Sequence, residues 1–185
     1  MHALEIHRLK PHPAMMPKLV SAVEVELIAT VDDLLLTFIV SGKEHLKLAE
    51  WLPAKRRDGL WQTTCFELFI KEANTDSCFE YFEFNFSPST EWAAYKFERY
   101  RDGRVDVSLS VDPFIERGLE NDQYVIEVDV DLSDIPPRQL QIGLSAVIEE
   151  NDGTKSYWAL AHPPGQPDFH HGDCFALQLA APSSS

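Results

Sequence analysis

Two stretches decide the fold: residues 61–71, WQTTCFELFIK, and residues 79–97, FEYFEFNFSPSTEWAAYKF. Large apolar residues alternate with polar ones in both, and side chains that alternate with a period of two are typical of β-strands. The polar segment 72–77 and the turn-forming residues 87–90 separate the alternating runs. The stretch therefore predicts three consecutive antiparallel strands.

The same alternation gives this sheet two different faces. One face carries an apolar row, which comprises Phe66, Leu68, Ile70, Phe82, Phe84 and Phe86. We expect this row to face a core. If the three strands pair consecutively, the opposite face gathers Glu67, Glu83, Asn85, Trp92 and Lys96. Polar groups in mid-strand are costly to bury without partners, so we expect that second face to meet water or a ligand.

The remainder of the chain is predicted to be strands separated by turns. Alternating runs occupy residues 4–9, 20–31, 34–40, 105–111, 124–132, 140–148, 155–160 and 174–179. Residues 4–9 are expected to form an edge strand, and residues 43–57 a short helix or a covering loop. Many short strands with almost no helix predict an all-β, two-sheet antiparallel β-sandwich of immunoglobulin-like or jelly-roll type. We expect one domain over residues 1–181, followed by a disordered tail at 182–185.

Composition excludes several classes of function. The formal net charge of −14 disfavours binding to nucleic acid or to anionic membranes. No apolar run approaches the ~20 residues of a membrane-spanning helix, and the first residues lack the apolar centre of a signal peptide, so we expect a cytoplasmic protein. The cysteines are Cys65, Cys78 and Cys174. Cys65 and Cys78 can approach across the predicted hairpin, but buried free thiols are the favoured interpretation.

The polar face of the sheet is a candidate sugar-binding surface. A flat indole ring can stack on the C–H face of a sugar, which suggests roles for Trp61, Trp92 and Trp158. The four polar side chains of that face can bind hydroxyl groups, with Trp61 and Trp158 at its edges. Two ordinary alternatives stay open: each tryptophan packs in the core or at its rim, or Glu67, Glu83 and Lys96 form a hydrated ion-pair face.

The two glutamates also allow a second hypothesis. Paired carboxylates on either side of a glycosidic bond hydrolyse it as general acid and nucleophile, so Glu67 and Glu83 are candidate catalytic residues of a glycan-cleaving enzyme. Nothing in the sequence indicates the separation or the raised pKa that this chemistry requires. We therefore favour non-catalytic binding. A structural or protein-interaction sandwich is the third possibility.

A loop of unusual composition supplies secondary candidates. Residues 162–174 read HPPGQPDFHHGDC, and the candidate binding residues here are His162, Asp168, His170 and His171. Histidine, aspartate and cysteine are metal ligands, but their spacing matches no standard zinc pattern. We predict a structural loop and no metal.

Several of these segments together resemble a known family. The segments are CFELFI at 65–70, FEFNFSPS at 82–89, WAAY at 92–95, WALAHPPG at 158–165 and DFHH at 168–171. From about Trp61 to its end, the chain resembles the DOMON-like superfamily, which is similar to family 9 carbohydrate-binding modules. The resemblance implies a two-sheet sandwich that binds sugars or, in the DOMON cytochromes, haem.

The chain departs from that family at its metal positions. Sugar-binding relatives often carry paired aspartates where Thr63 and Thr64 stand here, so the resemblance does not support bound calcium. Haem-binding relatives ligate iron with methionine and histidine, whereas the methionines here are Met1, Met15 and Met16, outside the strand-rich region. We therefore predict no cofactor.

Overall fold

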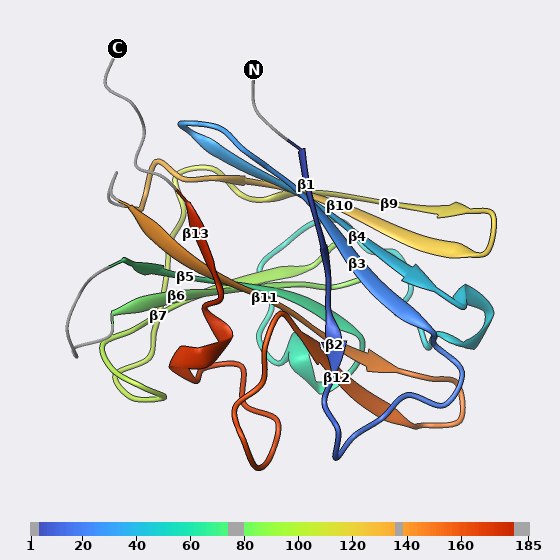
Figure 1. Ribbon diagram of the computed structural model, residues 1–185. Coiled ribbons are helices and arrows are strands. Elements are labelled where there is room, and N and C mark those ends of the chain that lie inside the picture. Colours follow the sequence, from blue (N-terminus) through green and yellow to red (C-terminus); the bar gives the residue numbers. More distant parts are fainter. Residues whose placement is uncertain (1–3, 74–79, 136–138, 180–185) are drawn as a thin grey trace.

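The structure is a computed structural model that describes residues 4–73, 80–135 and 139–179. Two antiparallel sheets pack face to face, as predicted (Figure 1). The smaller sheet has the order β1-β3-β4-β10-β9, with bounds Leu4–Arg8, Ala22–Ala29, Asp33–Ser41, Gln123–Asp131 and Phe114–Glu120. Within the described ranges there is no α-helix, and the helical turns are the 3-10 helices η1 (Lys43–His45), η2 (Leu60–Gln62) and η3 (Gly172–Cys174).

The larger sheet has the order β2-β12-β11-β5-β6-β7-β8. The bounds in this order are Lys10–Pro11, Lys155–Ala159, Leu140–Glu149, Cys65–Glu72, Tyr81–Phe86, Trp92–Phe97 and Val105–Asp106. A last strand, β13 (Leu177–Leu179), pairs with the beginning of β11, while β12 pairs with its end. Because β12 and β13 share one side of β11, the chain between them, residues 160–176, loops out of the sheet.

The apolar row forms the core between the sheets, as predicted. Phe66, Phe84 and Phe86 are fully buried there, and the ring of Phe66 lies 5.0 Å from that of Phe38 on β4 of the facing sheet. The predicted hairpin is also confirmed, because β5 pairs with β6 and places Leu68 opposite Phe84. Burying this apolar surface between the two sheets is the main favourable contribution to such a fold.

Some predicted elements differ in the structure. Residues 43–57 form the short turn η1 and a covering loop, and the strands predicted at 105–111 and 174–179 shorten to β8 and β13. The sequence did not predict β9, because this edge strand exposes Phe114 and Leu119 and lacks a clear two-residue alternation. The predicted tail at 182–185 and Cys78 lie outside the described residues, whereas Cys65 and Cys174 are free and buried.

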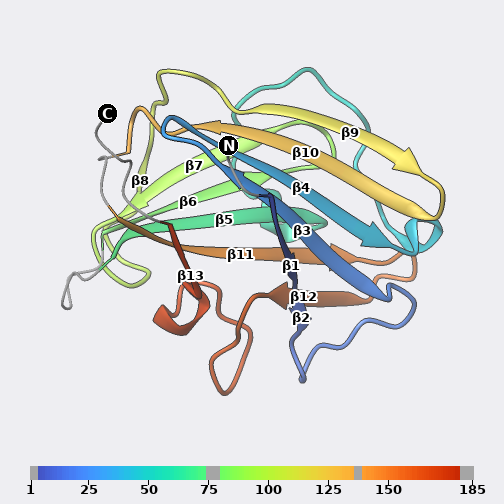
Figure 2. The same cartoon turned by 45° about the horizontal axis from the view of Figure 1, so that its top comes forward.

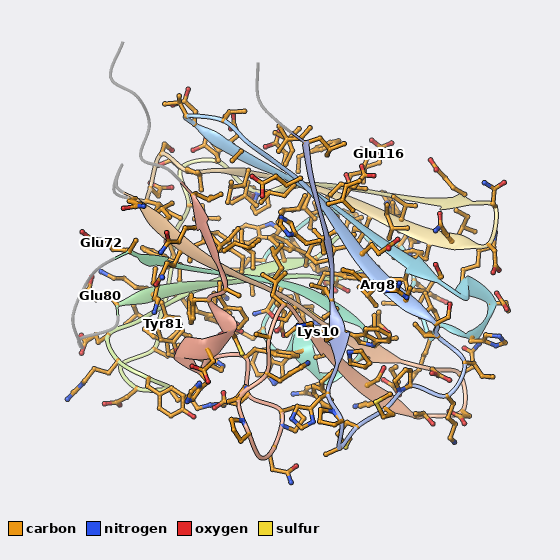
Figure 3. All side chains as sticks on the ribbon, in the orientation of Figure 1. Arg8, Lys10, Glu72, Glu80, Tyr81 and Glu116 are labelled. Atoms are coloured by element: carbon orange, nitrogen blue, oxygen red, sulfur yellow. The ribbon has the colours of Figure 1, made fainter. Side chains whose placement is uncertain are left out.

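The outer face of the larger sheet is covered by loops rather than left to solvent. Figure 2 shows η3 and the segment 160–176 on the side of β11 that faces away from the smaller sheet. Tyr81 of β6 lies on this covered side, close to η3, whereas Glu116 of β9 lies far away on the other sheet (Figure 3). A second apolar cluster fills this layer, and it includes Cys65, Phe69, Tyr81, Tyr95, Phe97, Phe169 and Phe175.

Candidate functional site

The site face is set by the pairing of β5, β6 and β7. Glu67 lies opposite Asn85, and Glu83 lies opposite Tyr95. Residues directly opposite each other in an antiparallel pair point to the same side of the sheet. Glu67, Glu83 and Asn85 therefore share the outer face, as predicted, and all three are buried beneath the loops.

Trp92 and Lys96 are on the other face, so their predicted placement is wrong. The register pairs Phe86 with Trp92 and Phe82 with Lys96, which puts both on the side of the core. Trp92 is 3% exposed and belongs to the core between the sheets. The Lys96 side chain is 35% exposed, and its ammonium lies 3.0 Å from the Glu80 carboxylate. The physical reason is the turn at residues 87–91, whose length sets the register and cannot be read from alternation alone.

The other two tryptophans separate as well. Trp158 is 2% exposed within the core, opposite Ala146, and its Nε1 donates to Ser156 Oγ at 2.9 Å, so it does not lie at the edge of the site. Trp61 does lie there: it is 37% exposed on η2, and its ring meets that of Tyr95 edge-on at 6.2 Å.

A cavity of about 440 Å³ opens between this face and the covering loops. Its aromatic and apolar walls are Trp61, Phe69, Phe97, Val147, Tyr157, Pro167 and Phe169. Its polar groups are Glu67, Glu83, Arg101, Arg104 and His170. Its volume and its mixture of apolar walls with a few polar groups are typical of a small-molecule site. A neighbouring cavity of about 410 Å³, walled by Tyr81, Tyr100 and Phe175, shares His170 with the first.

The two carboxylates beneath the cavity have different partners. Ser145 Oγ donates to Glu67 Oε2 at 2.9 Å, and Asn85 Nδ2 donates to Glu83 Oε1 at 2.7 Å. Burial, reinforced by the Glu83 carboxylate, raises the pKa of Glu67 to about 8. Burial also raises the pKa of Glu83, while the bond from Asn85 and the guanidinium groups of Arg104 and Arg101 act in the opposite direction. At neutral pH Glu67 is therefore largely protonated and offers the cavity a donor.

The roof of the site is the predicted loop, tied to the turn after β7. The Asp168 carboxylate accepts from the Arg101 guanidinium at 2.8 Å and from the Tyr100 hydroxyl. Burial raises the pKa of Asp168, but these hydrogen bonds and the charge of Arg101 outweigh it and lower the pKa. Because Asp168 also accepts from the backbone N–H of His170, it holds the turn and the loop together over the sheet.

The four loop candidates therefore do not act together. Asp168 and His170 belong to the roof, and His170 lines the cavity. His171 lines the neighbouring cavity, where its Nδ1 accepts from the backbone N–H of Asp173. His162 lines neither cavity. Its Nε2 donates to the backbone carbonyl oxygen of Lys10 at 2.8 Å, and its ring meets that of His12 edge-on.

Apart from Trp61 and His170, sequence reasoning missed the cationic and aromatic residues of the site. The turn after β7 brings Arg101 and Arg104 to the cavity, and the Arg104 guanidinium lies 4.7 Å from the centre of the Tyr95 ring. The alternation that placed Glu67 also places Phe69 on this face, so that signal was present. The return of Phe169 over the sheet has no comparable signal, because it follows from long-range pairing of β11.

In the described part of the chain, no cluster of three or more histidine, cysteine, aspartate or glutamate side chains is arranged to hold a metal ion. The same residues contain no helix long and apolar enough to span a membrane.

Comparison with solved structures shows which proteins share this fold. The crystal structure of a candidate carbohydrate-binding protein from Bacteroides uniformis superposes with a TM-score of 0.68 at 14% identity, covering 92% of this chain and 84% of that one. A family 9 carbohydrate-binding module from Caldicellulosiruptor kristjanssonii also aligns, in its complexes with glucose and with cellotriose. Each alignment has a TM-score of 0.48 at 14% identity and covers 85% of this chain. The share of the module that is covered is 76% in the glucose complex and 75% in the cellotriose complex. At these identities the likeness concerns the fold.

No protein-family model matches the chain. No curated protein matches its sequence either.

Proposed function

We propose that this protein binds a carbohydrate in the cavity beneath the roof loop and does no chemistry on it. The observation that carries the proposal is the composition of the cavity, which combines the 37% exposed indole of Trp61 at its rim with two buried carboxyl groups, two exposed guanidinium groups and a partly buried imidazole. Sugars present apolar C–H faces together with hydroxyl groups that donate and accept, and these walls match both properties.

The fold that this chain shares with solved structures supports the proposal but is not sufficient evidence for it. The superposition that covers most of both chains is with a candidate carbohydrate-binding protein. The fold is therefore shared with a protein that is thought to bind carbohydrate. The finer assignment to the DOMON-like superfamily, a single domain over residues 1–181 and residence in the cytoplasm remain predictions.

A glycan array followed by isothermal titration calorimetry tests the proposal. Replacing Trp61 with alanine is expected to weaken the best array ligand by about 1–2 kcal/mol, which corresponds to roughly tenfold or more in affinity. Trp51 is the matched control, because it is 62% exposed and does not line the cavity. An equal loss of affinity in the two variants would mean that the sugar does not bind in this cavity. A protein that binds no sugar would favour the protein-interaction alternative.

One observation favours glycan hydrolysis as a second candidate function. Glu67 and Glu83 line one cavity, and the pKa of Glu67 is raised to about 8, as a general acid requires. Hydrolysis would release new reducing ends from the array ligand, and Glu83→Gln would abolish that release. Binding without release over a long incubation would contradict this second function.

A further inference from the structure

The side chain of His170 is held in one orientation at the boundary of the two cavities. It is 15% exposed, and the rings of Phe69 and Phe97 meet it edge-on at 5.2 and 5.1 Å. It lines both cavities and stands between them. An imidazole packed in this way presents a fixed nitrogen to each side.

The hydrogen bonds of Tyr81 determine which nitrogen carries the proton. The buried Tyr81 hydroxyl lies 2.8 Å from His170 Nδ1 and accepts from the backbone N–H of Arg101 at 3.2 Å. In the described residues, His170 Nδ1 is the acceptor available to the tyrosine hydrogen. A buried hydroxyl needs such an acceptor, so Tyr81 donates to Nδ1 and the ring proton is placed on Nε2. Burial and the charge of Arg101 lower the pKa of His170 to about 4, which keeps the ring neutral near pH 7.

His170 Nε2 faces Glu83 across a gap. The distance from Nε2 to Glu83 Oε2 is 3.8 Å, which is too long for a direct hydrogen bond. The other oxygen of Glu83 already accepts from Asn85. A fixed donor and a fixed acceptor, each anchored on its far side, therefore border the same cavity without satisfying each other.

We propose that His170 Nε2 and Glu83 Oε2 together recognise one hydroxyl group of the bound sugar, which accepts from the imidazole and donates to the carboxylate. The inference rests on the proposed function and adds the element of specificity. A hydroxyl can donate and accept at once, whereas a methoxy group only accepts and a hydrogen does neither. Sites built to bind a hydroxyl discriminate strongly against analogues that lack it. Tyr81 is then a positioning residue, because it acts on the ligand through His170.

The first test needs no sugar. Long-range nitrogen-15 NMR of the free protein reports the tautomer of each histidine, and His170 is expected to carry its proton on Nε2. In Tyr81→Phe the donor to Nδ1 is lost, and the signals of His170 are expected to shift toward a mixture of tautomers. His45, on η1 and away from the cavity, should be unchanged. A proton on Nδ1 in the wild-type protein would overturn the inference.

The second test uses monodeoxy and mono-O-methyl analogues of the best-binding monosaccharide from the array. In the wild-type protein, one position is expected to lose about tenfold or more in affinity with either analogue. In His170→Ala, the parent sugar and its deoxy analogue at that position should bind within about twofold of each other, while His45→Ala keeps the wild-type pattern. Undiminished discrimination in His170→Ala would overturn the inference and leave the proposed function standing. If no sugar on the array binds, both the inference and the proposed function fail, even if the tautomer is as expected.

Discussion

Replacing Glu67 with glutamine gives the most direct test of the buried carboxyl pair. Glutamine has nearly the shape of a protonated glutamate and can still accept from Ser145, but it cannot ionise. In the folded protein, burial and the nearby Glu83 carboxylate raise the pKa of Glu67 from its ordinary 4.5 to about 8. In the unfolded chain the same carboxyl releases its proton near the ordinary value.

The pH dependence follows from this difference. Between pH 4.5 and 8 the folded protein retains a proton that the unfolded chain has lost, so the free energy of unfolding falls as pH rises through this window. The stabilisation is complete below pH 4.5 and is lost above pH 8. At one pKa unit per roughly 1.4 kcal/mol, the full effect is at most roughly 5 kcal/mol. The variant does not suffer this loss.

Urea denaturation at pH 4.5 and pH 8.5 measures the effect. The variant and the wild type are expected to agree within about 1 kcal/mol at the lower pH, and the variant to be more stable by about 2–5 kcal/mol at the higher pH. Glu127→Gln, on the exposed face of β10, is the matched control. If the difference between Glu67→Gln and wild type is the same at both pH values, the pKa of Glu67 is not raised in the folded protein.

Three further substitutions test contacts that hold the fold together, each by chemical denaturation with circular dichroism. Phe84→Ala should cost about 3–5 kcal/mol because the ring is fully buried between the sheets, and a loss below about 1 kcal/mol would mean that the face is misassigned. Gly143→Ala should cost about 1–3 kcal/mol, because its added Cβ would lie 2.9 Å from the carbonyl oxygen of Cys174 and push η3 off the sheet; an unchanged midpoint would contradict that close approach. Glu150→Ala should cost about 1–3 kcal/mol, because the carboxylate accepts from backbone N–H groups that include the buried one of Val20, and glutamine at this position should recover part of the loss.

Much of the strand architecture could be predicted from the chain alone. The alternation in residues 62–71 and 79–87 assigns Phe66 and Phe84 to the core and Glu67 and Glu83 to the opposite face, and the structure agrees. This succeeds because a shift by one residue would expose a whole row of large apolar side chains, so the contrast between faces fixes the orientation of each strand.

The candidate site was only partly predictable. Trp92 and Trp158 have the residue type of a sugar-stacking surface, but both are buried in the core, since whether an indole faces ligand or core depends on its strand's register. The loop with His170 was predicted as an alternative to the sheet face. In the structure the loop and the sheet face enclose the same cavity.

The sequence by itself determined the class of fold, the face of each glutamate and the unusual composition of the roof loop, because these depend on residue type and local periodicity. The tertiary structure alone decided the register across the turn at 87–91. This register places Tyr95 and Phe97 on the site face, where Trp92 and Lys96 were predicted. It also decided that β12 and β13 share one side of β11, which returns residues 160–176 over the sheet. Both features depend on hydrogen bonds between strands distant in sequence, and no local pattern encodes which partners those strands choose.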